Sequence, residues 1–218
     1  QIKAVTADLV LINGVPINGM ENGKVYWSNW SGLSDVSQFI QVQRGLGASA
    51  LGISSVGGTM NMVTKSTEAQ KGGSAYFGIG NDGFRKYSVS FSTGLMDNGW
   101  AITFMGSLNT GDGYVKGTNY EGWTYFGNIS KVINDHHKLS LTAFGAPQWH
   151  NQRSTMHYIE DYKNSPDGGR FNNGYGYING EAVGSGYGYN YYHKPQVSLN
   201  HYWTIDEKST LTTSLYGS

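Results

Sequence analysis

The chain of 218 residues contains no cysteine, so neither a disulfide framework nor a thiolate metal site is open to it. Charged side chains are scarce, at 14% of the residues, and fifteen basic residues balance fifteen acidic ones. This balance argues against a nucleic-acid partner, because a nucleic-acid surface needs clustered Lys and Arg. The sequence has no run of about eighteen apolar residues, which argues against a transmembrane helix. It also shows no secretory signal peptide at Gln1, so we expect a mature or truncated start.

Glycine and tyrosine, by contrast, are abundant. The chain has 32 Gly and 16 Tyr, aromatic residues make up 14% of it, and the mean hydropathy is −0.42. This composition is typical of a β-rich chain with long loops. A transmembrane β-barrel is compatible with so hydrophilic an average, because only alternate strand residues contact lipid.

Apolar residues recur with a period of two from residue 73 onward. In the clearest run Tyr87, Val89 and Phe91 alternate with Ser88 and Ser90. Successive side chains of a strand point to opposite faces, so each such run predicts a strand with one apolar and one polar face. Seven strands are predicted, at residues 73–81, 86–95, 100–109, 123–132, 138–145, 196–205 and 209–216.

The predicted strands are long and their connections alternate in length. About ten residues, at roughly 3.3 Å each and a tilt near 45°, rise about 23 Å, which is close to the apolar band of an outer-membrane barrel. Three connections are tight turns and two are long, and the two kinds fall on opposite ends. This is the pattern of short periplasmic turns and longer outer loops. One short connection, 81–83, falls on the outer end and breaks the pattern. The long connections are 111–122 and 147–195.

Three tryptophans lie near strand ends on the apolar faces. With that topology, Trp100 and Trp203 mark the periplasmic membrane interface and Trp123 the outer interface, a depth that amphipathic rings favour. The alternative is a soluble β-sandwich whose core they fill, but sandwich strands are usually about five or six residues long.

The first seventy residues follow a different pattern. Residues 10–15 predict a short strand and a turn at Asn13-Gly14, and 19–32 predict a loop with Tyr26, Trp27 and Trp30. Further strands are predicted at 39–43 and 59–64, on either side of a segment rich in Gly and Ser. A small mixed domain before a barrel is therefore expected.

A distinctive series of residues lies between 42 and 65: Arg44-Gly45, Gly52, Gly57-Gly58, Asn61 and Thr64-Lys65. This series resembles the end of the plug domain of TonB-dependent receptors. Upstream, 10–15 is similar to the family's strand of three apolar residues followed by Asp-Gly-Val. The chain departs from the family at Leu46 for Pro, Leu51 for Tyr and Asn13 for Asp. The motif covers 8–66. The style of Gly45–Lys65 and of Phe144–Gln148 looks like receptors of Bacteroidetes-type bacteria.

The resemblance implies a mainly β fold: part of a plug domain, then antiparallel strands of a large transmembrane β-barrel of about 22 strands. We expect the C-terminal part of the plug at residues 1–70 and the first seven or so barrel strands at 71–218. Since seven strands cannot close a bacterial single-chain barrel, which has an even count, we expect the chain to be a fragment.

The implied function is TonB-dependent active transport of a scarce nutrient across the bacterial outer membrane. The implied partners are TonB with ExbB and ExbD, through an N-terminal segment that we do not find in the sequence, and outer-membrane lipid. The substrate stays open among small molecules such as an iron chelate or cobalamin, glycans and peptides. We expect no cofactor, no resident metal and no nucleic acid.

Arg44 belongs to the plug motif. In this family such an Arg is expected to lie in the barrel lumen and to pair with a wall carboxylate, which would hold the plug in place. The alternative is an ordinary solvated surface Arg.

Two aromatic-rich segments are candidates for substrate recognition. Tyr26, Trp27 and Trp30 are expected at the plug apex, where the family meets substrate, or else as anchors of the plug to the wall. The outer loop 147–195 contributes the candidates Trp149, His150 and Tyr158. Tyr and Trp combine large contact area with a polar tip. The alternative for this loop is a lid or a packing surface.

No catalytic constellation is found. His150 and His157 match no metal-site spacing, and Ser154 near His157 is not a nucleophile elbow. We therefore expect no enzyme activity. The rival hypotheses are a plain porin or adhesin barrel, an outer-membrane barrel enzyme, and a receptor-like barrel that is a structural subunit of a larger complex with a surface lipoprotein or other outer-membrane subunits.

Overall fold

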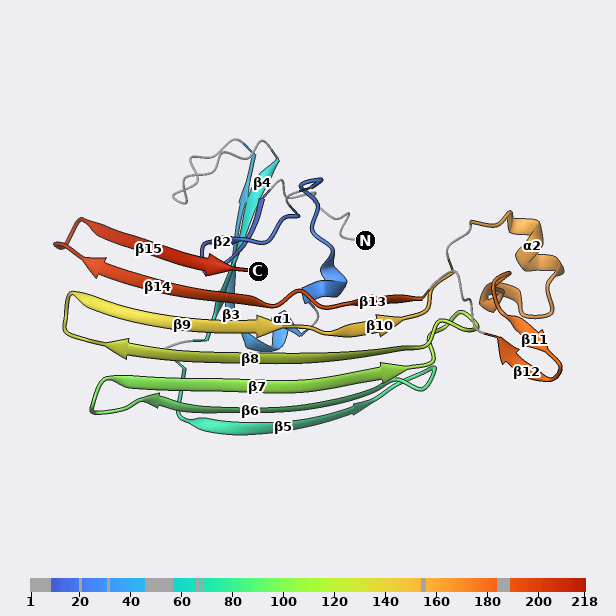
Figure 1. Cartoon of the computed structure of the whole chain (residues 1–218), viewed down its shortest axis with the longest axis horizontal. Coiled ribbons are helices and arrows are strands. Elements are labelled where there is room, and N and C mark those ends of the chain that lie inside the picture. Colours follow the sequence, from blue (N-terminus) through green and yellow to red (C-terminus); the bar gives the residue numbers. More distant parts are fainter. Residues whose placement is uncertain are drawn as a thin grey trace.

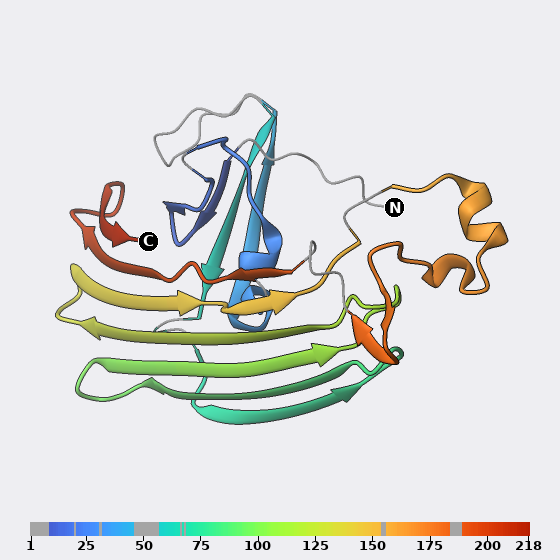
Figure 2. The ribbon, with the colours of Figure 1, turned by 45° about the vertical axis from the view of Figure 1, so that its right-hand side comes forward.

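Two main sheets make up the chain. The computed structural model describes residues 9–19, 21–30, 32–45, 57–65, 67, 69–153, 156–183 and 189–218. A small N-terminal sheet stands on one face of a broad sheet of long strands, and β3 and β4 run steeply across the direction of the long strands (Figures 1 and 2). We call residues 9–65 the plug unit and the broad sheet the wall.

The plug unit is a four-stranded sheet with two short helices. Its strands lie in the order β2-β1-β4-β3, with β1 parallel to β4 and the other pairs antiparallel. The elements are β1 (Leu9–Ile12), β2 (Val15–Pro16), the 3-10 helix η1 (Trp27–Trp30), α1 (Leu33–Val36), β3 (Ser37–Arg44) and β4 (Gly58–Thr64). The three predicted plug strands are thereby confirmed, and the loop predicted at 19–32 contains η1. The Gly- and Ser-rich segment from 46 to 56 lies outside the described residues.

Two motif asparagines hold the β1–β2 turn against β4. Asn13 and Gly14 both have positive φ, 51° and 82°, as a tight hairpin turn requires. The side-chain amide of Asn13 donates to Thr64 Oγ1 at 2.8 Å and accepts from the Thr64 backbone N–H at 2.9 Å. The Gly14 N–H donates to Asn61 Oδ1 at 3.1 Å. Asn13, which replaces the family's usual Asp, can both donate and accept in this clamp.

The wall contains the seven long antiparallel strands that the sequence predicts. They follow the order β15-β14-β9-β8-β7-β6-β5, so each long strand pairs with the next long strand along the chain. Their bounds are β5 (Gly72–Ile79), β6 (Arg85–Leu95), β7 (Trp100–Gly111), β8 (Tyr120–Val132), β9 (His137–Gly145), β14 (Gln196–Thr204) and β15 (Thr210–Gly217). None of the helices among the described residues is long and apolar enough to cross a membrane.

The two faces of the wall are inverted relative to a soluble sheet. Polar side chains such as Asn128, Ser140 and Thr142 are buried on the face toward the plug unit, where Asn128 donates to both hydroxyls. The apolar residues of the opposite phase, including Ile102 and Leu141, are exposed on the outside. This is the arrangement of a barrel wall with a polar interior and an apolar outer band.

The described parts of the long connection 147–195, residues 147–153, 156–183 and 189–195, contain regular elements. β10 (Gln148–His150) pairs with both β8 and β13 (Asn190–Tyr192), which lengthens the wall at one end. Beyond it lies a compact outer lobe, residues 156–183, drawn in orange in Figure 1. The lobe contains α2 (Ile159–Asn164), the 3-10 helix η2 (Gly168–Arg170), β11 (Gly176–Ile178) and β12 (Glu181–Val183).

Candidate binding site between the plug unit and the wall

The plug unit and the wall share one apolar core. Buried side chains of the plug unit, among them Trp30, Leu33 and Val36, join Met105, Phe126, Phe144 and Ala146 of the wall. The rings of Trp30 and Phe144 stack with centroids 5.8 Å apart and planes 12° apart. This contact fixes the plug unit against β8 and β9.

Trp30 is the centre of that contact and is only 4% exposed. Of the two roles considered for it, anchoring of the plug unit to the wall is supported by this position, and Trp30 also lines the outer pocket described next. The Lys194 ammonium lies 5.9 Å from the Trp30 ring centroid, within the range of a cation–π contact.

An outer pocket lies between the plug loop and β13. Its volume is about 520 Å³, within the range of pockets that hold small ligands. Tyr26, at 54% exposed, lies at this pocket, whereas Trp27, at 50% exposed, is not among its lining residues. The lining consists of Ile17, Gly19, Glu21, Asn22, Lys24, Tyr26, Ser28, Asn29, Trp30, Asn190, Tyr192 and Lys194.

Amides and hydroxyls prepare this pocket for polar contacts. Asn22 donates to the Tyr26 hydroxyl at 3.0 Å, and the Gln148 side chain reaches Asn29 Oδ1 at 3.4 Å, which links the plug loop to the wall. Asn190 Nδ2 lies 3.3 Å from His150 Nε2, so His150 contacts a residue of the pocket lining without lining the pocket itself. The site is therefore suited to hydrogen bonding and ring stacking, which need no proton transfer.

Trp149 lies on the other face of the wall. Its register partners are Glu121 on β8 and Tyr191 on β13, and cross-strand partners share a face. Glu121 accepts a hydrogen bond from the exposed Trp123 at 2.9 Å, so these rings cover the outside of the wall. The register thus turns Trp149 away from the outer pocket and toward the membrane-facing side, where it stacks on Tyr189 at 6.1 Å.

Tyr158 is also separate from the pocket. It precedes α2 in the outer lobe, is 84% exposed, and its backbone N–H donates to Asp161 at 3.0 Å. The lobe is tied to the neighbouring outer turns by Arg170–Asp82, at 2.7 Å, and by Lys116–Asp167, at 2.5 Å. The hydrogen bond from Lys116 to Asp167 raises the pKa of the ammonium above its usual value.

Arg44 lies at the end of β3 remote from the wall. β3 begins beside α1 at the wall and runs away from it, as Figure 1 shows, and Arg44 is exposed. Among the described residues, no carboxylate forms an ion pair with it. The predicted wall partner would therefore have to come from outside the described wall, and the pairing stays a prediction.

Among the described residues, the ion pair that joins plug unit and wall is Asp35–Lys86, with Nζ 2.6 Å from Oδ2. The sequence reasoning missed this pair, although Lys86 falls in the polar phase of its strand, next to serines. A lysine facing a barrel interior calls for a counter-charge, and that was the available signal.

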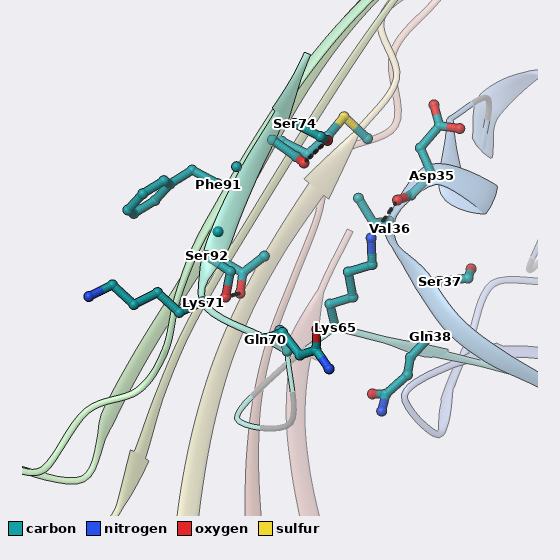
Figure 3. Close-up of a pocket in the computed structure, with 16 residues that line it drawn as sticks. Asp35, Val36, Ser37, Gln38, Lys65, Gln70, Lys71, Ser74, Phe91 and Ser92 are labelled. Atoms are coloured by element: carbon teal, nitrogen blue, oxygen red, sulfur yellow. Dashed lines mark hydrogen bonds between the residues drawn. The ribbon is translucent and has the colours of Figure 1, made fainter. Parts of the chain in front are cut away.

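A second cavity of about 470 Å³ has Asp35 in its lining and lies between α1 and β3 on one side and β5–β7 on the other. Figure 3 shows Asp35, Lys65 and Gln38 of the plug unit opposite Ser74 and Ser92 of the wall, while the Phe91 ring points away from the plug unit. The lining of this cavity includes several serine and threonine hydroxyls. Across the described part of the chain, no group of three or more His, Asp or Glu is arranged to hold a metal ion.

The structure closely matches known plug-and-barrel receptors. The ferric-catecholate import receptor Fiu from E. coli K12 aligns with a TM-score of 0.69 at 16% identity, over 97% of this chain and 31% of that one. The siderophore receptor PiuA from Acinetobacter baumannii gives 0.68 at 15% identity, over 97% and 28%. The copper transporter OprC gives 0.66 at 13% identity, over 95% and 28%.

The fold is therefore that of an outer-membrane receptor with a plug and a β-barrel. More narrowly, it is the fold of the TonB-dependent receptors. The chain spans 31% of the length of Fiu and 28% of the length of PiuA. No family model matches the sequence, and no curated protein matches it either.

Proposed function

We propose that this chain belongs to a TonB-dependent transporter that imports a scarce nutrient across the outer membrane of a bacterium. The observation that carries the proposal is the plug unit packed on the polar face of the wall, with Trp30 stacked on Phe144. The alternative of a plain porin or adhesin barrel does not predict a plug unit packed on this face. The neighbouring folds are receptors and transporters, which supports a transport role over an enzymatic one.

Substrate would first meet the outer pocket between the plug loop and β13. Its aromatic rings and amides come from both the plug unit and the wall, so a ligand there would contact both parts at once. TonB, with ExbB and ExbD, would then supply the energy that displaces the plug. Iron chelates, cobalamin, glycans and peptides all remain candidate substrates.

The test uses the full-length protein that carries this chain in its native host. Deletion of its gene should abolish growth when one of those nutrients is the sole limiting source, and deletion of TonB should have the same effect on that source. Growth that survives without TonB, or that no limiting source makes dependent on the gene, would contradict the proposal.

The pocket is tested by substitutions in the same strain. Tyr26→Ala and Asn190→Ala should weaken uptake on the order of tenfold or more, because each removes a side chain that lines the pocket. For Tyr26 the loss of an anchor ring can cost about 2 kcal/mol of binding free energy. Tyr158→Ala is the matched control, since Tyr158 is exposed on the separate outer lobe. Equal losses in all three would argue against the pocket.

A second candidate function is a structural subunit of a larger outer-membrane complex. Apolar side chains of the outer lobe are strongly exposed, with Met156 at 98%, which suits a surface that another subunit covers. A protein that purifies in a stable complex with a surface lipoprotein, and whose outer pocket tolerates substitution, would favour this candidate.

A further inference from the structure

The plug unit is sealed against the wall unevenly. Toward β8 and β9 the interface is apolar, because Trp30 and Leu33 pack with Phe126 and Phe144. Met105 on β7 belongs to this apolar core and also lines the cavity on the β5–β7 side, so the core ends there. One side of the interface is therefore a close-packed apolar contact, and the other is an open gap that polar and apolar side chains line together.

The gap on the β5–β7 side is continuous. A cavity of about 470 Å³ and a neighbouring one of about 410 Å³ share Asp35, Lys65, Ser74, Ser90 and Met105 as lining residues. On the side of β5–β7, serine and threonine hydroxyls line these cavities and several are paired with each other: the Ser74 and Ser90 hydroxyl oxygens lie 2.8 Å apart, and Thr103 donates to Ser92 at 3.1 Å (Figure 3). Hydroxyls can exchange hydrogen bonds with a passing polar solute or its water shell.

The Asp35–Lys86 ion pair crosses this gap. Lys86 Nζ lies 2.6 Å from Asp35 Oδ2, and the two side chains are 25% and 26% exposed. Within the described ranges it is the one ion pair that joins plug unit and wall. Lys65 Nζ donates to the backbone carbonyl of Asp35 at 3.3 Å, and this hydrogen bond holds α1 beside the end of β4.

We propose that the Asp35–Lys86 ion pair is a latch, and that its opening frees a route for polar solutes along the hydroxyl-lined gap beside β5–β7. The Trp30–Phe144 contact is the fixed side about which α1 moves. This inference rests on the proposed transport function, and it specifies which side of the plug unit opens and which residues control the opening. A local movement that breaks one ion pair leaves the apolar contact in place.

The experiment measures basal conductance of the full-length protein in planar lipid bilayers, without nutrient and without TonB. Asp35→Lys and Lys86→Asp each put like charges across the gap and should raise basal conductance on the order of fivefold. The double exchange, Asp35→Lys with Lys86→Asp, restores opposite charges and should return conductance toward the wild-type level. Asp167→Lys is the matched control, because it breaks the Lys116 ion pair of the outer lobe.

A blocking variant locates the route. Ser90→Trp fills the gap and should suppress the extra conductance of Lys86→Asp. Wild-type conductance in both single variants, or leak in the double exchange equal to that of the singles, would overturn the latch. If the variant that carries both Lys86→Asp and Ser90→Trp still leaks, the proposed route beside β5–β7 is wrong. Since no nutrient or TonB is present, these outcomes are separate from failure of the proposed import function, which growth measures.

Discussion

Gly32 shows how closely the plug unit approaches the wall at a single residue. It has φ of 78°, and a Cβ built on it would lie 2.5 Å from Thr124 Oγ1 on β8. The absence of a side chain therefore serves two purposes, the left-handed backbone that leads into α1 and the contact with β8. Its position between Trp30 and Leu33 explains why the surrounding chain can bury both.

We predict that Gly32→Ala loosens the plug unit more than a purely conformational effect would. The left-handed backbone alone costs an L-residue about 1–2 kcal/mol, and displacement of Thr124 adds to that. Protease protection of the plug unit in the folded full-length protein is the measurement. Gly23→Ala is the control, because Gly23 has φ of 68° and nothing within 4 Å of its ideal Cβ. Equal loss of protection in the two variants would show that the wall contact is unimportant.

The wall strands were predictable at the scale of the element, and the connecting segments were not. Alternation such as Tyr87-Ser88-Val89-Ser90-Phe91 encodes both the strand and its two faces, because the period of two has no other regular solution. The plug strands were also predictable, since Asn13-Gly14 encodes a hairpin turn. The clamp that Asn13 forms with β4, by contrast, depends on a residue 51 positions away.

The secondary structure in the described parts of the connection 147–195 was not predicted, because tertiary contacts stabilise it. β10 has three residues and is stabilised by β8 and β13 on either side. Its phase was nevertheless readable: counted from the plug-facing Phe144, alternation places Gln148 inside and Trp149 outside. The ion pair Asp35–Lys86 joins residues 51 positions apart, and no local pattern locates its acidic partner.

We predict that the two faces of the wall differ in their access to lipid. Spin labels at Val89, Ile102, Leu141 and Leu199 should be quenched by lipid-soluble oxygen, because these residues lie on the exposed apolar face. Labels at Ser88, Thr103 and Ser140 serve as the comparison set and should be protected. The opposite pattern would mean that the register is shifted by one residue, which moves every side chain to the other face.

The whole molecule has two distinct ends. The tight turns that join β6 to β7, β8 to β9 and β14 to β15 lie at one end of the wall, and the outer lobe lies at the other (Figure 1). Trp100 and Trp203 lie close to the tight turns, and Trp123 lies close to the lobe. If the proposed function holds, the first end is periplasmic and the second is outside the cell.

This orientation predicts an asymmetric labelling pattern in intact cells. These 218 residues have no native cysteine, so each single Cys variant reports one position once any cysteine elsewhere in the full-length protein has been replaced. Tyr177→Cys in the outer lobe should react with a membrane-impermeant maleimide, and Lys208→Cys in the turn before β15 should react only after the outer membrane is permeabilised. Reaction of Lys208→Cys in intact cells would reverse the assigned orientation.

The parallel pairing of β1 with β4 determines how the plug sheet bears tension. Leu9 lies opposite Thr59 and Ile12 opposite Met62, so the N-terminal end of β1 and the C-terminal end of β4 are at opposite ends of the pair. A pull at Leu9, opposed by the tether from Thr64 to the wall, slides the two strands along each other and loads all their hydrogen bonds together. An antiparallel pair pulled in this way would peel open one bond at a time. The sheet therefore resists as a unit, and tension passes through β4 to Lys65, whose backbone N–H is bonded to the Val36 carbonyl of α1 at 3.0 Å.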